Sequence, residues 1–343
     1  MASRAVVSRP VVSRAVLLLA HGTPGTVDEI PEYLRNVVSG RPMPQAVIEE
    51  IQHRYAQIGE PKGHSPLTEL TLEQAALLQA ELARTGDPVP VYVGMRNWRP
   101  YIADVVKQMR ADGIEAATVI CLAPQNSRTS VGLYRRAALA EAGGIRMDFL
   151  DGWADEPLLA EAFADRLRTV HQRLSTETGK PAPVIFTAHS VPCRTIQTPA
   201  ASEGQPILWP TTGPVATPDP YPVEAKRTAA LVAQRVHEIQ AWYFAFQSQG
   251  ASGGPWIGPG VEATLDGLAA EGAKTVIVHP IGFLCDHVEI LYDIDIAFRA
   301  HAAKLGMRLE RPESLNASPI LTAALAKLAR QGLARLDQAT LEA

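Results

Sequence analysis

Residues 275–295 combine an apolar run with four acids and two histidines, side chains that can bind metals and move protons. Asp286, Glu289 and Asp293 follow one another at spacings of three and four. A helix that begins near Asp286 would place their carboxylates, oxygen ligands for hard cations, on one face. Acids are also common at helix starts, where the helix dipole favours them, so the spacing alone leaves a plain solvated helix start open.

A second candidate lies at residues 182–192, where another apolar run ends on His189 just before a loop. In open α/β sheets, ligands bind beyond the carboxyl ends of the strands. We therefore expect His189 and Glu289, each near such an end, to face one cleft. A hydrogen-bonded structural histidine is the alternative for His189.

The composition describes a globular protein long enough for two domains. Of its 343 residues, 46% are hydrophobic, and charges of both signs are interspersed. The formal net charge of -4 and the absence of a long Lys/Arg run predict no nucleic-acid partner. No segment reaches the ~20 apolar residues that span a bilayer, so we expect no transmembrane segment.

The cysteines Cys121, Cys193 and Cys285 are widely spaced and include no Cys-x-x-Cys pair. This spacing predicts no iron–sulfur cluster and suits a reducing compartment, so we expect a cytoplasmic protein. Residues 1–14 carry Arg and Ser without acids but lack the apolar core of a secretory signal. We interpret them as a flexible N-terminal tail.

Apolar runs alternate with helical patterns along the chain, which predicts parallel sheets covered by helices. The runs are 15–20, 89–93, 117–122, 184–188, 275–280 and, more weakly, 242–246. The helical patterns are 46–58, 72–85, 100–112, 157–174, 223–239, 261–271 and 319–333. We predict an α/β fold of two similar Rossmann-like domains with a cleft between them.

A weak internal echo supports two similar halves, because both His21 and His189 follow an apolar strand and precede a proline by three residues. The predicted domains are 15–181 and 182–318, with helix 319–333 packing back on the first domain. Residues 195–218, rich in Pro, Gly, Ser and Thr, are interpreted as an insertion beside His189. A lid and a structureless loop both remain open for it.

Several motifs in this order resemble the ferrochelatases, which insert ferrous iron into a porphyrin, and the resemblance covers nearly the whole chain. The motifs are His21-Gly-Thr-Pro24, Arg54-Tyr55, Ile58-Gly59, Ser65-Pro-Leu67, Leu122-Ala-Pro-Gln-Asn-Ser127, Ala188-His-Ser-Val-Pro192, Asp219-Pro-Tyr-Pro222, Gln247-Ser248, Trp256-Ile-Gly-Pro259 and Gly282-Phe-Leu-Cys-Asp-His-Val-Glu-Ile-Leu-Tyr-Asp293. The resemblance implies a class II chelatase fold and a lyase of haem biosynthesis.

Within the family, Leu122-Ala-Pro, Asp155-Glu-Pro157 and Arg311-Pro-Glu313 resemble the coproporphyrin branch. The implied product is iron coproporphyrin III, with protoporphyrin IX as the alternative substrate. The implied partners are the porphyrin, Fe(2+) and, transiently, neighbouring enzymes of the haem pathway. Iron enters as a substrate, and no prosthetic group is expected.

The resemblance assigns catalysis and metal contact to His189 and Glu289. In this interpretation His189 accepts pyrrole protons, Glu289 is its carboxylate partner, and Asp293 and Asp295 form a possible metal path. His21 stands where well-known members of the coproporphyrin branch carry an iron-ligating tyrosine. We expect His21 to bind iron axially, although a role in capping its loop is equally open.

The porphyrin-contacting positions of the family fall on His21, Arg54, Tyr55, Ser65 and Tyr134. An arginine can clamp a propionate through two hydrogen bonds, and hydroxyls supply neutral ones. Tyr55 is equally interpretable as a core residue. Val38 stands where the branch often has an arginine, and Arg35 or Arg41 is the candidate replacement.

Two other functions compete with iron insertion. One is a chelatase of the same architecture that uses cobalt or nickel with a different tetrapyrrole, since ligand type selects a metal only loosely. The other is a non-catalytic porphyrin or haem carrier, in which His21 binds iron and His189 is incidental. Turnover distinguishes the carrier from the enzymes.

Overall fold

The computed structural model describes residues 13–196, 218–250 and 254–342. The first twelve residues of the predicted tail, and residues 197–217 of the predicted insertion, lie outside these ranges. The described chain forms two four-stranded parallel sheets, ordered β2-β1-β3-β4 and β6-β5-β7-β8. The predicted fold class, two helix-flanked parallel sheets, is confirmed.

The first sheet consists of β1 (Arg14–Ala20), β2 (Val91–Met95), β3 (Ala116–Cys121) and β4 (Arg146–Leu150). The second consists of β5 (Val184–His189), β6 (Trp242–Gln247), β7 (Thr275–Pro280) and β8 (Arg308–Glu310). The strands β1 and β5 lie inside their sheets and are almost continuously apolar, as strands covered on both faces must be.

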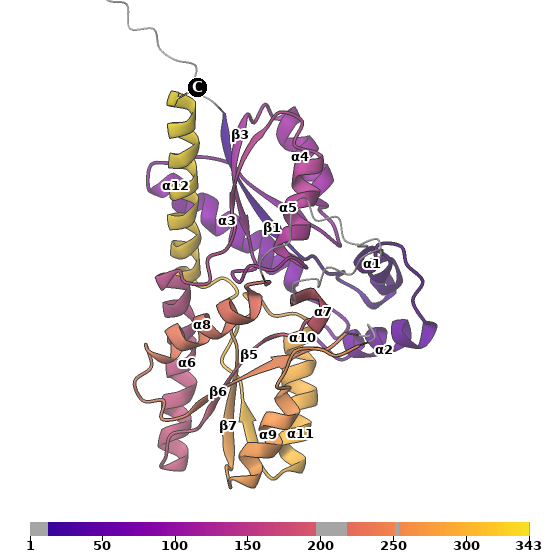
Figure 1. The fold of residues 1–343 in the computed structure, drawn as a ribbon, viewed down its shortest axis with the longest axis vertical. Coiled ribbons are helices and arrows are strands. Elements are labelled where there is room, and N and C mark those ends of the chain that lie inside the picture. The colour runs from indigo at the N-terminus through magenta and orange to yellow at the C-terminus, as the bar shows by residue number, and fades with distance from the viewer. Residues whose placement is uncertain (1–12, 197–217, 251–253, 343) are drawn as a thin grey trace, which may run out of the picture.

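Helices cover both sheets, and their bounds are α1 (Ile30–Val37), α2 (Gln45–Ala56), α3 (Leu67–Arg84), α4 (Ile102–Ala111), α5 (Val131–Ala140), α6 (Pro157–Thr178), α7 (Cys193–Ile196), α8 (Tyr221–Ala233), α9 (Val261–Ala270), α10 (Val288–Leu291), α11 (Arg299–Lys304) and α12 (Pro319–Glu342). A short 3₁₀ turn, Val27–Glu29, precedes α1, and a π-helix, Asp293–Phe298, follows α10. In Figure 1, α12 runs beside the first sheet and α6 beside the second, while α1 and α2 stand to one side near the junction.

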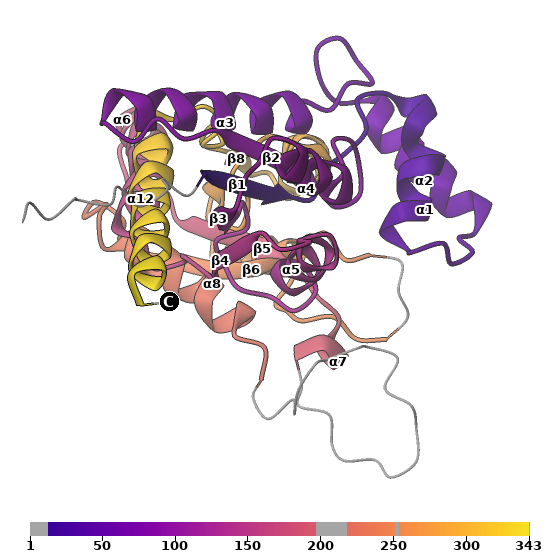
Figure 2. The same cartoon turned by 90° about the horizontal axis from the view of Figure 1, so that it is seen from above.

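The C-terminal helix α12 returns to the first half of the chain, where it packs against α3, α6 and β3. Figure 2 shows it beside β3, with α1 and α2 set apart at the opposite end. One apolar core joins the two halves, because it includes Val16 and Ile120 of the first sheet and Phe186 and Ile277 of the second. The divisions at 15–181 and 182–318 remain a prediction.

Two elements differ from the sequence-based expectations in a way that affects the acids. The helix expected near Asp286 begins at Val288 instead, and after four residues it passes into the π-helix. Asp286 therefore precedes the helix, and its carboxylate accepts from Ser314 and Asn316 instead. The predicted ladder is wrong for Asp286, whereas the Glu289 and Asp293 carboxylates still lie close enough for the charge of Glu289 to raise the pKa of Asp293.

Candidate active site at the meeting strand ends

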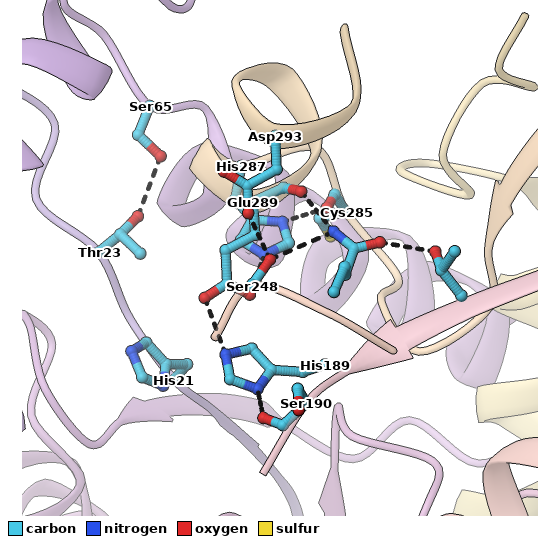
Figure 3. A network of polar contacts seen from close by, with 12 residues as sticks. His21, Thr23, Ser65, His189, Ser190, Ser248, Cys285, His287, Glu289 and Asp293 are labelled. Atoms are coloured by element: carbon cyan, nitrogen blue, oxygen red, sulfur yellow. Dashed lines mark hydrogen bonds and ion pairs between the residues drawn. The ribbon is translucent and has the colours of Figure 1, made fainter. Parts of the chain in front are cut away.

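The two histidines of the internal echo come from the carboxyl ends of β1 and β5. His189 is the last residue of β5, and His21 directly follows β1. Figure 3 shows both rings directed toward one region, with Glu289 above His189. Two glycines permit this approach: Gly22 has a φ of 77°, and a Cβ on Gly282 would lie 2.7 Å from the Ala188 Cβ.

His189 and Glu289 form an ion pair, with 3.2 Å between His189 Nε2 and Glu289 Oε1. The two side chains are 34% and 29% exposed, so the pair remains accessible. The sequence places these residues a hundred positions apart, and the structure brings them into contact.

Neighbouring polar groups hold both members of the pair. The Nδ1 atom of His189 contacts the Ser190 carbonyl, which leaves Nε2 to face Glu289. Gln247 Nε2 donates to the Glu289 carbonyl oxygen at 2.6 Å, and Gln247 Oε1 accepts from Thr187 at 2.6 Å. These bonds attach the backbone of α10 at Glu289 to β5 and β6.

A second histidine, His287, contacts the same carboxylate, with 3.5 Å between its Nε2 and Glu289 Oε2. Its Nδ1 lies 2.9 Å from the Cys285 carbonyl oxygen, and its ring packs on Phe283. The sequence analysis did not select His287 as a site residue. Its position two residues before Glu289 was the available signal.

Charges in the pair stabilise one another. Burial alone would lower the pKa of His189, but the charge and hydrogen bond of Glu289 outweigh it and raise the pKa above its usual value. For Glu289, burial would raise the pKa, and the two histidines hold it well below its usual range. Glu289 therefore stays ionised at neutral pH.

His21 lies opposite this pair and has two neighbouring hydrogen-bonding groups. Its Nε2 is 2.9 Å from the Tyr33 hydroxyl, and Asn97 Nδ2 is 3.2 Å from its Nδ1. Although the His21 side chain is accessible, the surrounding protein removes enough hydration to lower its pKa to about 4. The neutral imidazole is the form that binds metals. Tyr33 and Asn97 were not predicted from the sequence.

Asp293 and Asp295, the predicted metal path, face different partners. Asp293 accepts from Ser248 and lies 3.7 Å from Arg54 Nη1, and burial raises its pKa to about 6. Both carboxylate oxygens of Asp295 accept from Arg311, at 2.9 and 2.7 Å. Asp295 is therefore held by an arginine, and only Asp293 is adjacent to the pair.

The predicted porphyrin contacts divide by burial. Arg54 on α2 is half-exposed and contacts Glu50 and the face of Tyr292. Tyr55 is 1% exposed within the apolar cluster of α1 and α2, and Ser65 is 0% exposed and bonded to Thr23 at 3.1 Å. Both side chains are buried in this structure, and their contact with a porphyrin stays a prediction.

Tyr134 and the two arginines considered as replacements near Val38 have distinct surroundings. Tyr134 is 4% exposed on α5, and burial raises the pKa of its hydroxyl. Arg35 donates to the Pro31 carbonyl and Arg41 to the Val38 carbonyl, both near the exposed end of α1. Neither arginine contacts the histidine pair in the structure.

The described residues contain no group of three or more His, Cys, Asp or Glu side chains arranged to hold a metal ion. They also contain no helix long and apolar enough to cross a membrane. At the predicted site, the Glu289 carboxylate contacts two imidazoles, those of His189 and His287.

Two parallel four-stranded sheets flanked by helices form a fold of the class II chelatase type. Two solved structures of the sirohydrochlorin chelatase SirB share this fold: the Bacillus subtilis protein with Fe3+ at a TM-score of 0.53, and the protein of subspecies spizizenii with cobalt at 0.51. Their sequences are 13% and 12% identical to this chain, and they cover 95% and 94% of it and 98% and 95% of their own lengths.

Sequence relatives specify the family. A Ferrochelatase family model matches residues 13–333. The ferrochelatase of Acidobacterium capsulatum is 63% identical, over 94% of this chain and 95% of its own. The coproporphyrin III ferrochelatase of Geobacillus kaustophilus is 34% identical, over 91% and 94%. The chain belongs to the ferrochelatase family, metal-chelating lyases that insert iron into porphyrins.

Proposed function

We propose that the chain inserts ferrous iron into coproporphyrin III, with His189 and Glu289 as the catalytic pair. The contact between these two side chains is the observation that carries the proposal. The relatives named coproporphyrin III ferrochelatases support the substrate. Iron is a substrate in this reaction, and we expect no prosthetic group beside it.

Metal insertion requires two pyrrole N–H protons to leave while the hydrated cation loses water. His189, in its neutral form, accepts a proton from the ring at Nε2. Glu289 remains ionised, stabilises the imidazolium that forms and provides an oxygen toward the metal. Asp293, with a pKa near 6, is the adjacent group that can pass protons or cations onward. Contacts distant from the nitrogens hold the ring in a bent form, which can contribute about 1–5 kcal/mol.

His21 is proposed as an axial ligand of the product iron. Two observations support this role: the ring of His21 is neutral, and it lies across from His189, so the two imidazoles would meet opposite faces of a porphyrin bound between them. Binding iron through Nε2 requires release of the Tyr33 hydroxyl, whereas binding through Nδ1 requires release of Asn97.

The test is anaerobic turnover of Fe(II) with coproporphyrin III and with protoporphyrin IX, in the parent and in His189→Ala. We expect many metallated rings per parent molecule, faster with coproporphyrin III, and a loss of about 100-fold or more in His189→Ala. His301→Ala is the matched control, because His301 pairs with Asp266 on the outer helices.

Each alternative has its own result. Metallation that stops at one ring per protein, or binding only of ring already metallated, would indicate a carrier. Faster turnover with protoporphyrin IX would refute coproporphyrin III as the preferred substrate, but iron insertion would still stand as the reaction. A preference for cobalt or nickel over iron would indicate a chelatase that acts on a different metal and tetrapyrrole.

A further inference from the structure

Arg96 carries a charge that no carboxylate of the described residues neutralises. It directly follows β2, where its backbone N–H donates to the Ala20 carbonyl oxygen at 3.0 Å. The side chain is largely buried, and its only hydrogen bond within the described part of the chain runs from Nη1 to Asn97 Oδ1 at 3.3 Å. Other arginines near the site, such as Arg54 and Arg311, have acidic partners.

A partly buried guanidinium without a counter-charge is costly. Burial lowers the pKa of Arg96, although an arginine still remains protonated at neutral pH. Its five N–H donors are arranged to bind a carboxylate through two parallel bonds. A single weak bond to Asn97 leaves most of these donors available to an anionic ligand.

Arg96 lies next to the proposed porphyrin site. The register of β1 and β2 aligns Ala20 with Met95, so Arg96 lies beside His21 at the same edge of the sheet. Asn97 connects the two, because it accepts from Arg96 through Oδ1 and contacts the His21 ring through Nδ2.

Tyr134 adds a hydroxyl on the neighbouring helix α5. Its ring packs among residues at the ends of β1 and β3, and its hydroxyl has no hydrogen-bond partner among residues 13–196, 218–250 and 254–342. Arg96 and Tyr134 lie within electrostatic reach of one another, since each shifts the pKa of the other.

We propose that Arg96 is a specificity-determining residue that binds a carboxylate of the porphyrin, with the Tyr134 hydroxyl as a second donor. Coproporphyrin III carries four carboxylates, whereas protoporphyrin IX carries two and has uncharged vinyl groups in place of the others. Arg96 would bind one of the two carboxylates that coproporphyrin III has and protoporphyrin IX lacks. It rests on the proposed function, because it concerns how that reaction selects its ring.

The experiment compares the parent with Arg96→Leu, Arg96→Lys and Arg99→Leu. Arg99 is the matched control: it lies on the same loop, is exposed, and already pairs with Glu32 at 2.7 Å. For each protein, the Kd of iron-free coproporphyrin III and of protoporphyrin IX is measured by porphyrin fluorescence, and KM and kcat by turnover.

We expect Arg96→Leu to weaken coproporphyrin III binding about 10- to 100-fold, the usual loss for a hydrogen bond to a charged group. Protoporphyrin IX binding should stay within about twofold of the parent. Arg96→Lys should recover part of the loss, because it keeps the charge and loses the two-bond geometry. Arg99→Leu should behave like the parent with both rings.

Equal losses with both rings, or no loss with either, would overturn the assignment of Arg96. Misfolding is separable, because removing an unpaired guanidinium should leave the thermal midpoint unchanged or raise it, and Arg96→Lys provides a second measurement. A parent that binds coproporphyrin III but turns over neither ring would instead refute the proposed function, and the binding data would still test Arg96.

Discussion

In the His189–Glu289 pair, the carboxylate sets the pKa of the histidine that acts as the base. Glu289 makes the imidazolium of His189 more stable, which raises the pH at which His189 becomes free to accept a proton. The same carboxylate supplies negative charge toward an incoming cation. Glu289 therefore has two effects: it decreases the fraction of His189 that is neutral near pH 7, and it increases the attraction for the metal. Only the first effect depends on pH in this range, so a pH profile separates the two.

Replacing Glu289 by Gln should shift the acidic limb of the kcat/KM profile to lower pH. Without the negative charge, burial is left to lower the pKa of His189, so the neutral base persists at lower pH. The maximum rate should fall at the same time, because the carboxylate toward the metal is lost. The pH profile of iron insertion measures both. Asp266→Asn, on the distant helix α9, should leave the profile in place. An acidic limb unchanged in Glu289→Gln would show that His189 does not set it.

A His21→Ala variant should change the absorption spectrum of the bound iron porphyrin product and weaken its binding, because an axial imidazole would be lost. Tyr33→Phe is the matched variant: it removes the hydroxyl 2.9 Å from His21 Nε2 and keeps the ring. We expect Tyr33→Phe to give a smaller spectral shift. A product complex of His21→Ala that matches the parent in spectrum and affinity would remove His21 from the iron.

At the scale of elements, the strands that carry the site were predictable and the helix after β7 was not. Buried apolar runs ending on His21 and His189 locate two strand ends directly. The short strands β4 and β8 escaped prediction because they lie at sheet edges and include polar residues such as Asp148 and Glu310. Periodicity is weakest in such strands.

The directions of the carboxylates on the π-helix could not be predicted from the local sequence. Its acids are held by distant groups: Ser248 from the end of β6 contacts Asp293, and Arg311 after β8 clamps Asp295. These tertiary contacts decide which way each carboxylate points, so spacing alone could not show that Asp286 and Asp295 both pair with Arg311. The site pair was predictable because its members follow strand ends, whereas Tyr33, Asn97 and Arg96 are recognisable only from their contacts.

The strand β7 contains an acid-sensitive residue, His279, whose pKa burial lowers to about 3. It is 1% exposed, and its Nε2 lies 3.1 Å from the Phe163 carbonyl oxygen on α6. A lowered pKa in the folded state means that the unfolded chain binds the proton more readily. The stability contribution is present above pH 6.5 and is lost as the pH falls from 6.5 toward 3.

Between pH 8 and pH 5, His279 should therefore account for a loss of about 2 kcal/mol in the free energy of unfolding. His279→Gln retains an amide donor for the Phe163 carbonyl and cannot titrate. Urea unfolding at both pH values should show a smaller pH-dependent loss in this variant than in the parent. His53→Gln, at an exposed position on α2, should keep the parent's pH dependence. Equal losses in His279→Gln and parent would contradict the assignment.

At the scale of the whole molecule, the two halves are joined through one core, and the site depends on that junction. The helix α12 packs against β3 and β4 of the first sheet, α6 packs against β7 of the second, and the two helices pack against each other. Gln74 on α3 also donates to the Asn316 carbonyl at 2.8 Å. His21 and His189 come from different sheets, so their mutual placement is only as firm as this shared packing. A rigid junction is needed to keep two faces of a porphyrin site in register.

Phe163 on α6 tests this junction. It is 1% exposed, belongs to the core that both sheets share, and packs edge-on against His279 at 5.5 Å between ring centroids. Truncating it to Ala removes a large buried side chain, which typically costs about 3–5 kcal/mol. Leu139→Ala is the control, because Leu139 is 50% exposed and should change stability by less than about 0.5 kcal/mol.

Because the core is shared, the Phe163→Ala loss should appear equally in both halves of the molecule. Variants that retain a single tryptophan, Trp153 in the first half or Trp242 in the second, report each half by fluorescence during urea unfolding. Their midpoints should coincide in the parent and move together in Phe163→Ala. Midpoints that separate, with one half unfolding while the other persists, would show that the halves fold independently and that some other contact keeps His21 opposite His189.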